Sequence, residues 1–131
     1  LPVELLCLVV AVGVLFISVA VAASAAVAQY GLAAQIGNRH DQAPPSAFLA
    51  RARRNAANHI EGLAMFAPLV LIAGQVGAFS AMTALAAMLF AGGRILHAVT
   101  YLLGIPIVRT LAFAVSTTGL VMMALALFKI I

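Results

Sequence analysis

Three polar residues near the middle of the chain have the types and spacing of a binding surface on one helix. Arg54, Asn58 and Glu61 fall within a narrow arc of one helix face at about 100° per residue. Asn55 is turned away from this arc, and His59 lies on another side. A guanidinium, an amide and a carboxylate on one face can hold the charged and polar groups of a small ligand.

A second polar group follows nearer the C-terminus. Arg94, His97 and Tyr101 have the spacing i, i+3, i+7, which again places them on one helix face. Arg109 follows after a short turn and joins them at the start of the next helix. The two groups together predict a polar, mostly cationic cavity between helices.

The predicted cavity suits a small zwitterion that carries more than one carboxylate. Arginine presents a planar fork that matches a carboxylate. Glu61 suits an amine, while Asn58 and Tyr101 offer neutral hydrogen bonds. An apolar second substrate could enter from the surrounding lipid.

Structural roles compete with this interpretation at several positions. Glu61 could form a buried ion pair with Arg54 or Arg94, which does not exclude contact with a ligand. Arg51 and Arg53 are more simply explained as interfacial anchors whose side chains extend to lipid head groups.

A metal site would have to use scattered residues. His40, Asp41 and His59 are the candidates, and two of them lie in an irregular loop. Their spacing is not that of a metal-ligand motif, so we expect no metal.

The elements that must position these residues are membrane helices. Of the 131 residues, 66% are apolar and 8% are charged, against about 45–50% and 25% in a soluble domain. This excludes a soluble globular protein, a disordered chain and a disulfide scaffold, since Cys7 is the one cysteine. The net charge of +4 is then a signal of topology, and no nucleic acid is expected as a partner.

The apolar runs predict an all-α integral membrane protein, a single domain (residues 1–131) that forms an up-down bundle of four helices. The spans are expected at about 4–30, 55–77, 80–103 and 107–130, with a cytoplasmic loop at about 31–54. The first run is too long for a signal peptide, and no Lys or Arg precedes it.

Local signals refine the ends of these helices. The segment 41–45 has the composition of an irregular loop, and Ser46 can cap a helix that begins at about Ala47. Pro68 is expected to kink this helix. Gly104-Ile105-Pro106 is expected to form a short turn.

The basic residues predict an orientation. Arg39, Arg51, Arg53 and Arg54 lie in or beside the first loop, and Arg109 follows the last turn, whereas the opposite side has only Lys129. The positive-inside rule therefore places both of these connections in the cytoplasm and both termini outside.

Three motifs resemble those of a known family. They are Arg54-x-x-x-Asn58-x-x-Glu61 followed by Pro68, the string from Arg94 to Tyr101, and Pro106-Ile107-Val108-Arg109-Thr110. In order and placement they are similar to the MAPEG family, the membrane-associated proteins in eicosanoid and glutathione metabolism. The resemblance covers the whole chain and points to a bacterial-type member of the inner membrane.

The resemblance implies a homotrimer in which glutathione, as co-substrate, binds between subunits near the cytoplasmic side. It implies that Arg109 activates the thiol for attack on a lipophilic electrophile or a lipid hydroperoxide. The residues implied to hold glutathione are Arg39 (from the neighbouring subunit), Arg54, Asn58, Glu61, Arg94, His97, Tyr101 and Thr110. Phe113 departs from the pattern, because some members have a tyrosine there.

Two other functions compete with a glutathione-dependent enzyme. A non-catalytic lipid-binding member of the same family would not need to keep a charged cavity. A small multidrug exporter would need an acidic residue in the middle of the first span, where this chain has only Glu4 at the very edge.

Overall fold

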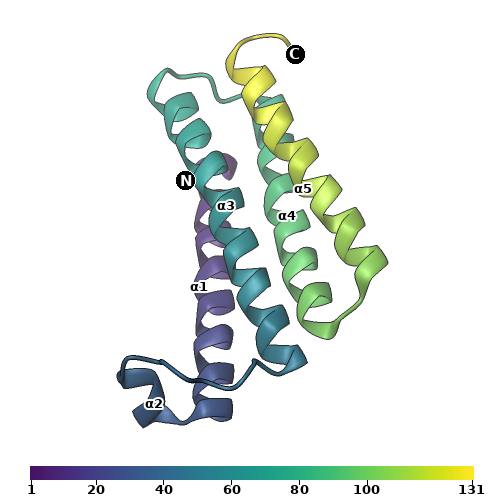
Figure 1. Cartoon of the computed structure of the whole chain (residues 1–131). Coiled ribbons are helices and arrows are strands. Elements are labelled where there is room, and N and C mark those ends of the chain that lie inside the picture. Colours follow the sequence, from purple (N-terminus) through teal and green to yellow (C-terminus); the bar gives the residue numbers. More distant parts are fainter.

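The computed structural model describes all residues 1–131 and is a bundle of four long helices (Figure 1). The helices are α1 (Val3–Tyr30), α2 (Leu32–Ile36), α3 (Ala47–Gln75), α4 (Ala81–Leu103) and α5 (Pro106–Leu127). All except the short α2 are long and apolar enough to cross a membrane. Both termini lie at the end of the bundle opposite α2, as an up-down bundle requires. The fold class expected from the sequence is therefore confirmed.

Local signals set the helix ends. The Ser46 side chain accepts a hydrogen bond from the Leu49 amide and so caps α3. At the start of α4, Ser80 and Thr83 bond each other's backbone amides in a capping box. Gly104 ends α4 in the left-handed region with φ of 74°. Glycine adopts this conformation without strain, and Pro106 then begins α5 after a very short turn.

The connection between α1 and α3 is fastened to the end of α1. The Tyr30 hydroxyl donates to the Ala43 carbonyl at 2.6 Å, and Gln29 Nε2 donates to the Pro44 carbonyl at 2.9 Å. Part of the segment expected as a loop is helical, since α2 occupies Leu32–Ile36. Its five residues carry no strong periodic signal, which is why the sequence did not indicate it.

Two glycines let α4 and α5 approach until their backbones touch. A Cβ atom on Gly93 would lie 2.7 Å from the Ser116 amide nitrogen, and one on Gly119 would lie 2.5 Å from the Ala86 carbonyl oxygen. Membrane helices associate through such small residues because lipid provides no hydrophobic driving force. The result is the most extensive helix pair in the bundle.

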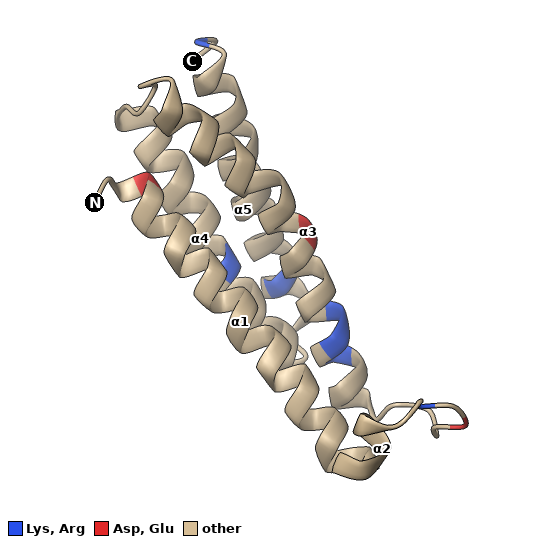
Figure 2. Ribbon diagram, turned by 90° about the vertical axis from the view of Figure 1, so that its left-hand side faces the viewer, with Lys and Arg blue, Asp and Glu red and all other residues tan.

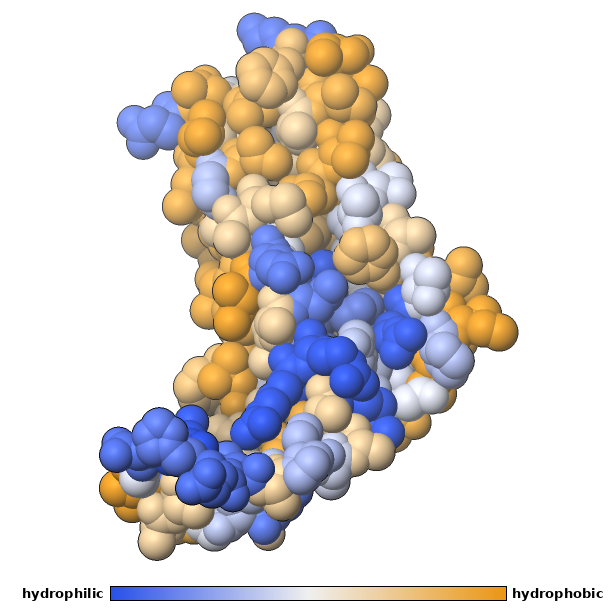
Figure 3. All heavy atoms as spheres, in the orientation of Figure 1, coloured by the Kyte–Doolittle hydropathy of each residue, from blue (hydrophilic) through white to orange (hydrophobic).

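The core lies between α3, α4 and the two outer helices. Phe66 of α3 and Phe90 of α4 stack with ring centroids 3.9 Å apart, and Val70 and Met123 are fully buried beside them. Many other large apolar side chains point outward. Figure 3 shows them covering the half of the molecule away from α2, as expected for a surface that faces lipid.

Candidate functional site

Helices α3 and α4 bring the two predicted polar faces together. Arg54 Nε donates to the Tyr101 hydroxyl at 3.2 Å, and Arg94 Nη1 donates to Asn58 Oδ1 at 2.6 Å. Each bond joins one residue of the first group to one of the second. Arg94 therefore bonds to the side-chain amide of Asn58. It does not form the ion pair with Glu61 that the sequence left open as an alternative.

Arg94 is held deep in the bundle by apolar surfaces. It is 4% exposed, and its Cζ lies 5.5 Å from the centre of the Phe90 ring and 5.9 Å from that of Phe113. Aromatic faces attract a guanidinium, more strongly when water is excluded. Its Nε is buried without a hydrogen-bond partner, so it is a free donor beside the cavity.

The space for this guanidinium depends on Gly62. A Cβ atom at that position would lie 2.8 Å from Arg94 Nη2 and 2.9 Å from Arg94 Cζ. Sequence patterns did not single out Gly62, because a glycine inside an apolar helix usually indicates close helix packing. Its place directly after Glu61 was the available signal.

A cavity of about 260 Å³ opens beside Arg94. It lies between α3, α4 and α5. Its polar and aromatic lining includes Asn58, Glu61, Arg94, Phe113, Ser116 and Thr117. Glu61 is exposed, which leaves its carboxylate free to meet a cation. Figure 3 shows hydrophilic surface over this half of α3, and Figure 2 shows that the arginines gather toward the α2 end of the bundle.

Tyr101 and Arg109 contact each other outside the lining of this cavity. The Arg109 Cζ lies 4.7 Å from the centre of the Tyr101 ring, close enough for a cation–π interaction. The short turn after Gly104 brings the start of α5 to this position. Tyr101 therefore contacts two arginines, Arg54 through its hydroxyl and Arg109 through its ring.

His97 does not line the cavity. It is 3% exposed, and its Nδ1 lies 3.4 Å from Nε2 of His59, which is 2% exposed. The sequence predicts that His97 faces a ligand and that His59 lies on another side of its helix from Arg54, Asn58 and Glu61. In the structure the two imidazole rings meet between α3 and α4. The sequence shows which residues share a face of one helix, but it does not show how one helix is rotated about its axis relative to its neighbour. The His59–His97 contact depends on that rotation and so could not be predicted from the sequence.

Two further candidates lie apart from the cavity. Arg39 donates from Nε and Nη2 to the Gln35 carbonyl at 3.0 and 2.9 Å, and with Arg53 it lines a separate hollow of about 410 Å³ beside α1. Thr110 is exposed, and its hydroxyl donates to the Pro106 carbonyl of its own helix at 2.9 Å.

No group of three or more His, Cys, Asp or Glu residues is arranged to hold a metal ion. Of the residues considered for such a site, His40 and Asp41 lie in the exposed connection before α3, whereas His59 is buried against His97.

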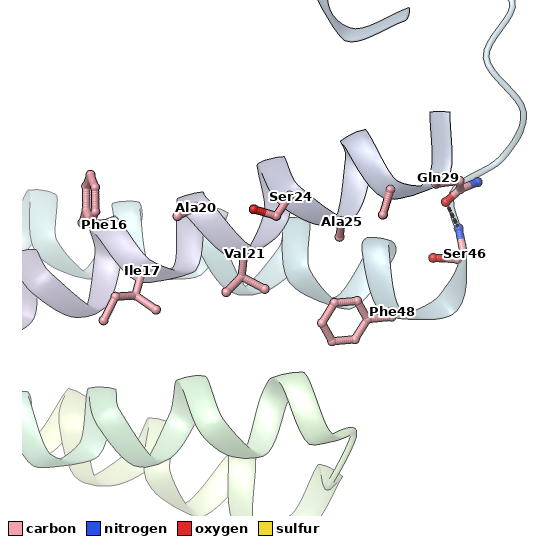
Figure 4. A pocket seen from close by; sticks show the side chains of 10 residues that line it. Phe16, Ile17, Ala20, Val21, Ser24, Ala25, Gln29, Ser46 and Phe48 are labelled. Atoms are coloured by element: carbon pink, nitrogen blue, oxygen red, sulfur yellow. Dashed lines mark hydrogen bonds between the residues drawn. The ribbon is translucent and has the colours of Figure 1, made fainter. Parts of the chain in front are cut away.

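An apolar hollow of about 700 Å³ lies along the outside of α1 (Figure 4). Phe16, Ile17 and Val21 of α1 line it together with Phe48 of α3. It shares no lining residue with the cavity beside Arg94. The molecule thus has a polar cavity and a separate surface suited to an acyl chain.

One comparison with known proteins gives a match. The sequence profile described as "MAPEG family" matches residues 5–129, nearly the whole chain. No curated protein and no solved structure matches the chain.

Proposed function

This chain belongs to the MAPEG family, and from that premise we propose that it is a membrane-bound, glutathione-dependent transferase or peroxidase. The family comprises membrane proteins of eicosanoid and glutathione metabolism. The proposal adds a substrate, a thiol-activating residue and a reaction to that assignment.

The observation that carries the proposal is the cavity formed around the Arg94–Asn58 bond. Glutathione has two carboxylates, one ammonium group and two amides. In the lining of the cavity, Arg94 supplies a fork for a carboxylate, Glu61 an anion for the ammonium group and Asn58 a neutral hydrogen bond. Arg54 and Tyr101 are bonded to each other outside this lining and offer a second fork and a second neutral group. An acyl-chain binder would have no use for these charges in a span, where each is costly.

Arg109 is proposed to activate the thiol. A free thiol has a pKa of about 8.5 and is mostly protonated at neutral pH. A guanidinium beside the sulfur in a partly dry site favours the thiolate. The thiolate then forms a C–S bond as the electrophile's leaving group departs. With a hydroperoxide it takes the terminal oxygen, which releases an alcohol, and a second thiol reduces the oxidised sulfur.

Three residues carry roles that rest on the family resemblance. Arg39 is proposed to reach glutathione in a neighbouring subunit. Thr110, one residue after Arg109, is proposed to bond the ligand near the sulfur. The resemblance gives His97 a role in holding glutathione, but its side chain is buried and does not line the cavity, so we propose that it supports the ligand face of α4 from behind.

The exposure of charged residues supports an assembly of several chains, and the number three rests on the family resemblance. Arg54 and Glu61 lie in α3 yet are exposed in the single chain. Lipid contact at such positions is costly, and a neighbouring subunit with glutathione bound between them would cover both. Native mass spectrometry in detergent is expected to show three chains. A stable and active monomer would contradict a shared site.

The proposal is tested by titrating the purified protein with glutathione while recording the ultraviolet absorbance of the thiolate. We expect saturable thiolate formation and conjugation of a lipophilic electrophile. Ophthalmic acid, which has a methyl group in place of the thiol, is the control: it should compete for binding and give no thiolate signal. Binding of fatty acids without any response to glutathione would favour the non-catalytic lipid-binding alternative.

A further inference from the structure

Two histidines form a buried pair directly behind the cavity. His59 Nε2 and His97 Nδ1 are 3.4 Å apart, and the two rings meet edge to face with centroids 5.4 Å apart. A hydrogen bond between two imidazoles needs an N–H on one and a lone pair on the other. Whichever ring donates, the contact restricts the orientation of the His97 ring, because one of its nitrogens must face His59.

The His97 ring in turn contacts Phe113, which lines the cavity, and Tyr101, which does not. It contacts the Tyr101 ring at 5.3 Å between centroids and the Phe113 ring at 6.2 Å. Tyr101 holds the Arg109 guanidinium over its face, and Phe113 lies beside the Arg94 guanidinium. A continuous series of ring contacts thus leads from His59 to both arginines.

The same helix interface shows that histidine is not needed for packing. Seven residues after His59 on α3 is Phe66, and seven residues before His97 on α4 is Phe90. These two rings stack with centroids 3.9 Å apart, in an apolar contact about two turns away along the interface. Polar groups are costly to bury, so an imidazole pair at the level of the cavity indicates that a directional contact is needed there.

We propose that His59 is a positioning residue, which through the His59–His97 contact and the Tyr101 ring sets the place of the Arg109 guanidinium. This inference rests on the proposed function for its catalytic consequence. His59 lines no part of the cavity. Its loss should therefore affect the chemical step more than the binding of glutathione.

The first test separates turnover from binding. His59→Leu is expected to lower kcat by about 10- to 100-fold, a usual cost of displacing a catalytic group by about an ångström. The KM for glutathione should change less than kcat, because the Arg94–Asn58 bond at the centre of the proposed binding surface does not involve His59. His59→Gln keeps a donor and an acceptor and should recover most of kcat.

Asn55→Leu is the matched control. Asn55 is also buried and polar and lies one turn earlier on α3, but its Nδ2 donates to Ser18 Oγ of α1 at 3.1 Å. This variant loses an interhelical polar contact of similar depth and should keep the wild-type kcat. Equal loss of kcat in Asn55→Leu and His59→Leu would overturn the positioning role, as would an unchanged kcat in His59→Leu.

A second test needs no glutathione. The chain has no tryptophan and two tyrosines, so in a Tyr30→Phe background all of the protein's tyrosine fluorescence comes from Tyr101. His59→Leu in this background is expected to change the emission intensity and the acrylamide quenching of Tyr101, and His59→Gln should restore both. If the leucine variant does not fold, His59→Phe, which places at this position the ring type found at Phe66, takes its place.

The two tests keep the proposals apart. If the wild-type protein forms no thiolate with glutathione, the proposed function is overturned. The positioning role of His59 is then still tested by the Tyr101 emission of the variants at position 59. Unchanged emission in every folded apolar variant at position 59 overturns the inference and leaves the proposed function standing.

Discussion

Tyr101 and Gly62 decide where two guanidinium groups lie. The Tyr101 ring, near the end of α4, lies against the Arg109 guanidinium of α5, and the missing side chain of Gly62 in α3 leaves room for the Arg94 guanidinium of α4. Neither residue supplies charge. At the scale of single residues, the candidate site is an arrangement of arginines that uncharged neighbours place.

Replacing Arg109 should separate chemistry from binding. We expect Arg109→Ala to lower kcat by about 100- to 1,000-fold, as is usual when a preorganised group that stabilises a developing anion is removed. The KM for glutathione should change much less, because Arg54, Asn58 and Arg94 remain. Arg109→Lys should recover part of the rate, since it keeps the charge and loses the planar fork. Steady-state kinetics and thiolate absorbance measure both effects, and a wild-type rate in Arg109→Ala would exclude the role given to Arg109.

Adding one carbon at position 62 should weaken glutathione binding without unfolding the protein. In Gly62→Ala the Cβ would meet Arg94 Nη2 at 2.8 Å, so the guanidinium must move away from its present place. A guanidinium that has moved would lose its charge-assisted hydrogen bond to a carboxylate of glutathione, and such a bond contributes about 1.5–3 kcal/mol. The dissociation constant for glutathione, measured by calorimetry, should therefore rise about 10- to 100-fold.

The matched control for this variant is Gly13→Ala, where a Cβ would meet nothing within 4 Å. It should bind glutathione like the wild type, and both variants should melt within a few degrees of it. If Gly62→Ala binds glutathione with the wild-type dissociation constant, the present position of Arg94 is not required for binding.

The sequence could predict the facing surfaces and not the contacts behind them. Helical spacing alone placed Arg54 and Asn58 on one face of α3, and Arg94 and Tyr101 on one face of α4. These two faces do meet in the structure. The His59–His97 contact depends on the rotation of α3 against α4, which is a tertiary property. The role of Gly62 depends on a neighbouring side chain in the same way.

The helices of the bundle are joined by two kinds of contact. Between α4 and α5 the contact is close and apolar and relies on Gly93 and Gly119. Between α3 and α4 the half nearest α2 is joined by polar side chains, Arg54 with Tyr101, Asn58 with Arg94 and His59 with His97. The first kind makes a rigid support for Arg109, and the second kind is also the proposed binding surface.

Replacing Gly119 in the α4–α5 contact by alanine should destabilise the protein. In Gly119→Ala the Cβ would lie 2.5 Å from the Ala86 carbonyl oxygen and 2.6 Å from the Phe90 amide nitrogen, both backbone atoms that cannot rotate away. Overpacking of this kind costs about 1–3 kcal/mol. Thermal denaturation in detergent should show a lower Tm.

The control for this prediction is Gly92→Ala, also on the α4–α5 hairpin, where a Cβ would meet nothing within 4 Å. Alanine favours helix over glycine, so this variant should melt at or slightly above the wild-type temperature. Equal Tm values for the two variants would mean that α4 and α5 are not in close contact.

Helix ends were predictable wherever a short motif sets them. Ser46 caps α3, and the turn at Gly104 and Pro106 joins α4 to α5, as their residue types indicate. The short α2 was not predictable, because five residues are too few to leave a periodic pattern.

The molecule as a whole has its arginines between the middle of the bundle and the end that carries α2. Figure 2 shows the basic residues toward the α2 end of the bundle, apart from the one at the C-terminus, Lys129. The opposite end instead holds a buried carboxylate, Glu4, which accepts a hydrogen bond from Thr83 Oγ1. This asymmetry carries the prediction that the α2 end faces the cytoplasm.

Labelling of single cysteines should test this orientation. In a Cys7→Ser background, Ala43→Cys reports on the connection after α2, and Val76→Cys reports on the turn after α3. Both positions are exposed. A membrane-impermeant maleimide added to intact cells should label position 76 and not position 43. The reverse pattern would invert the topology.

Position 62 also sets how easily the proposed activity is lost over evolutionary time. Every glycine codon becomes an alanine codon by a single nucleotide change, so one mutation can place a methyl group against Arg94. A descendant with that change keeps Arg54, Asn58 and Glu61 and still carries the family motif. A protein can therefore keep the family motif and lose the proposed activity through a change at one uncharged residue. A relative with a larger residue at this position would be a candidate for a family member that no longer binds glutathione.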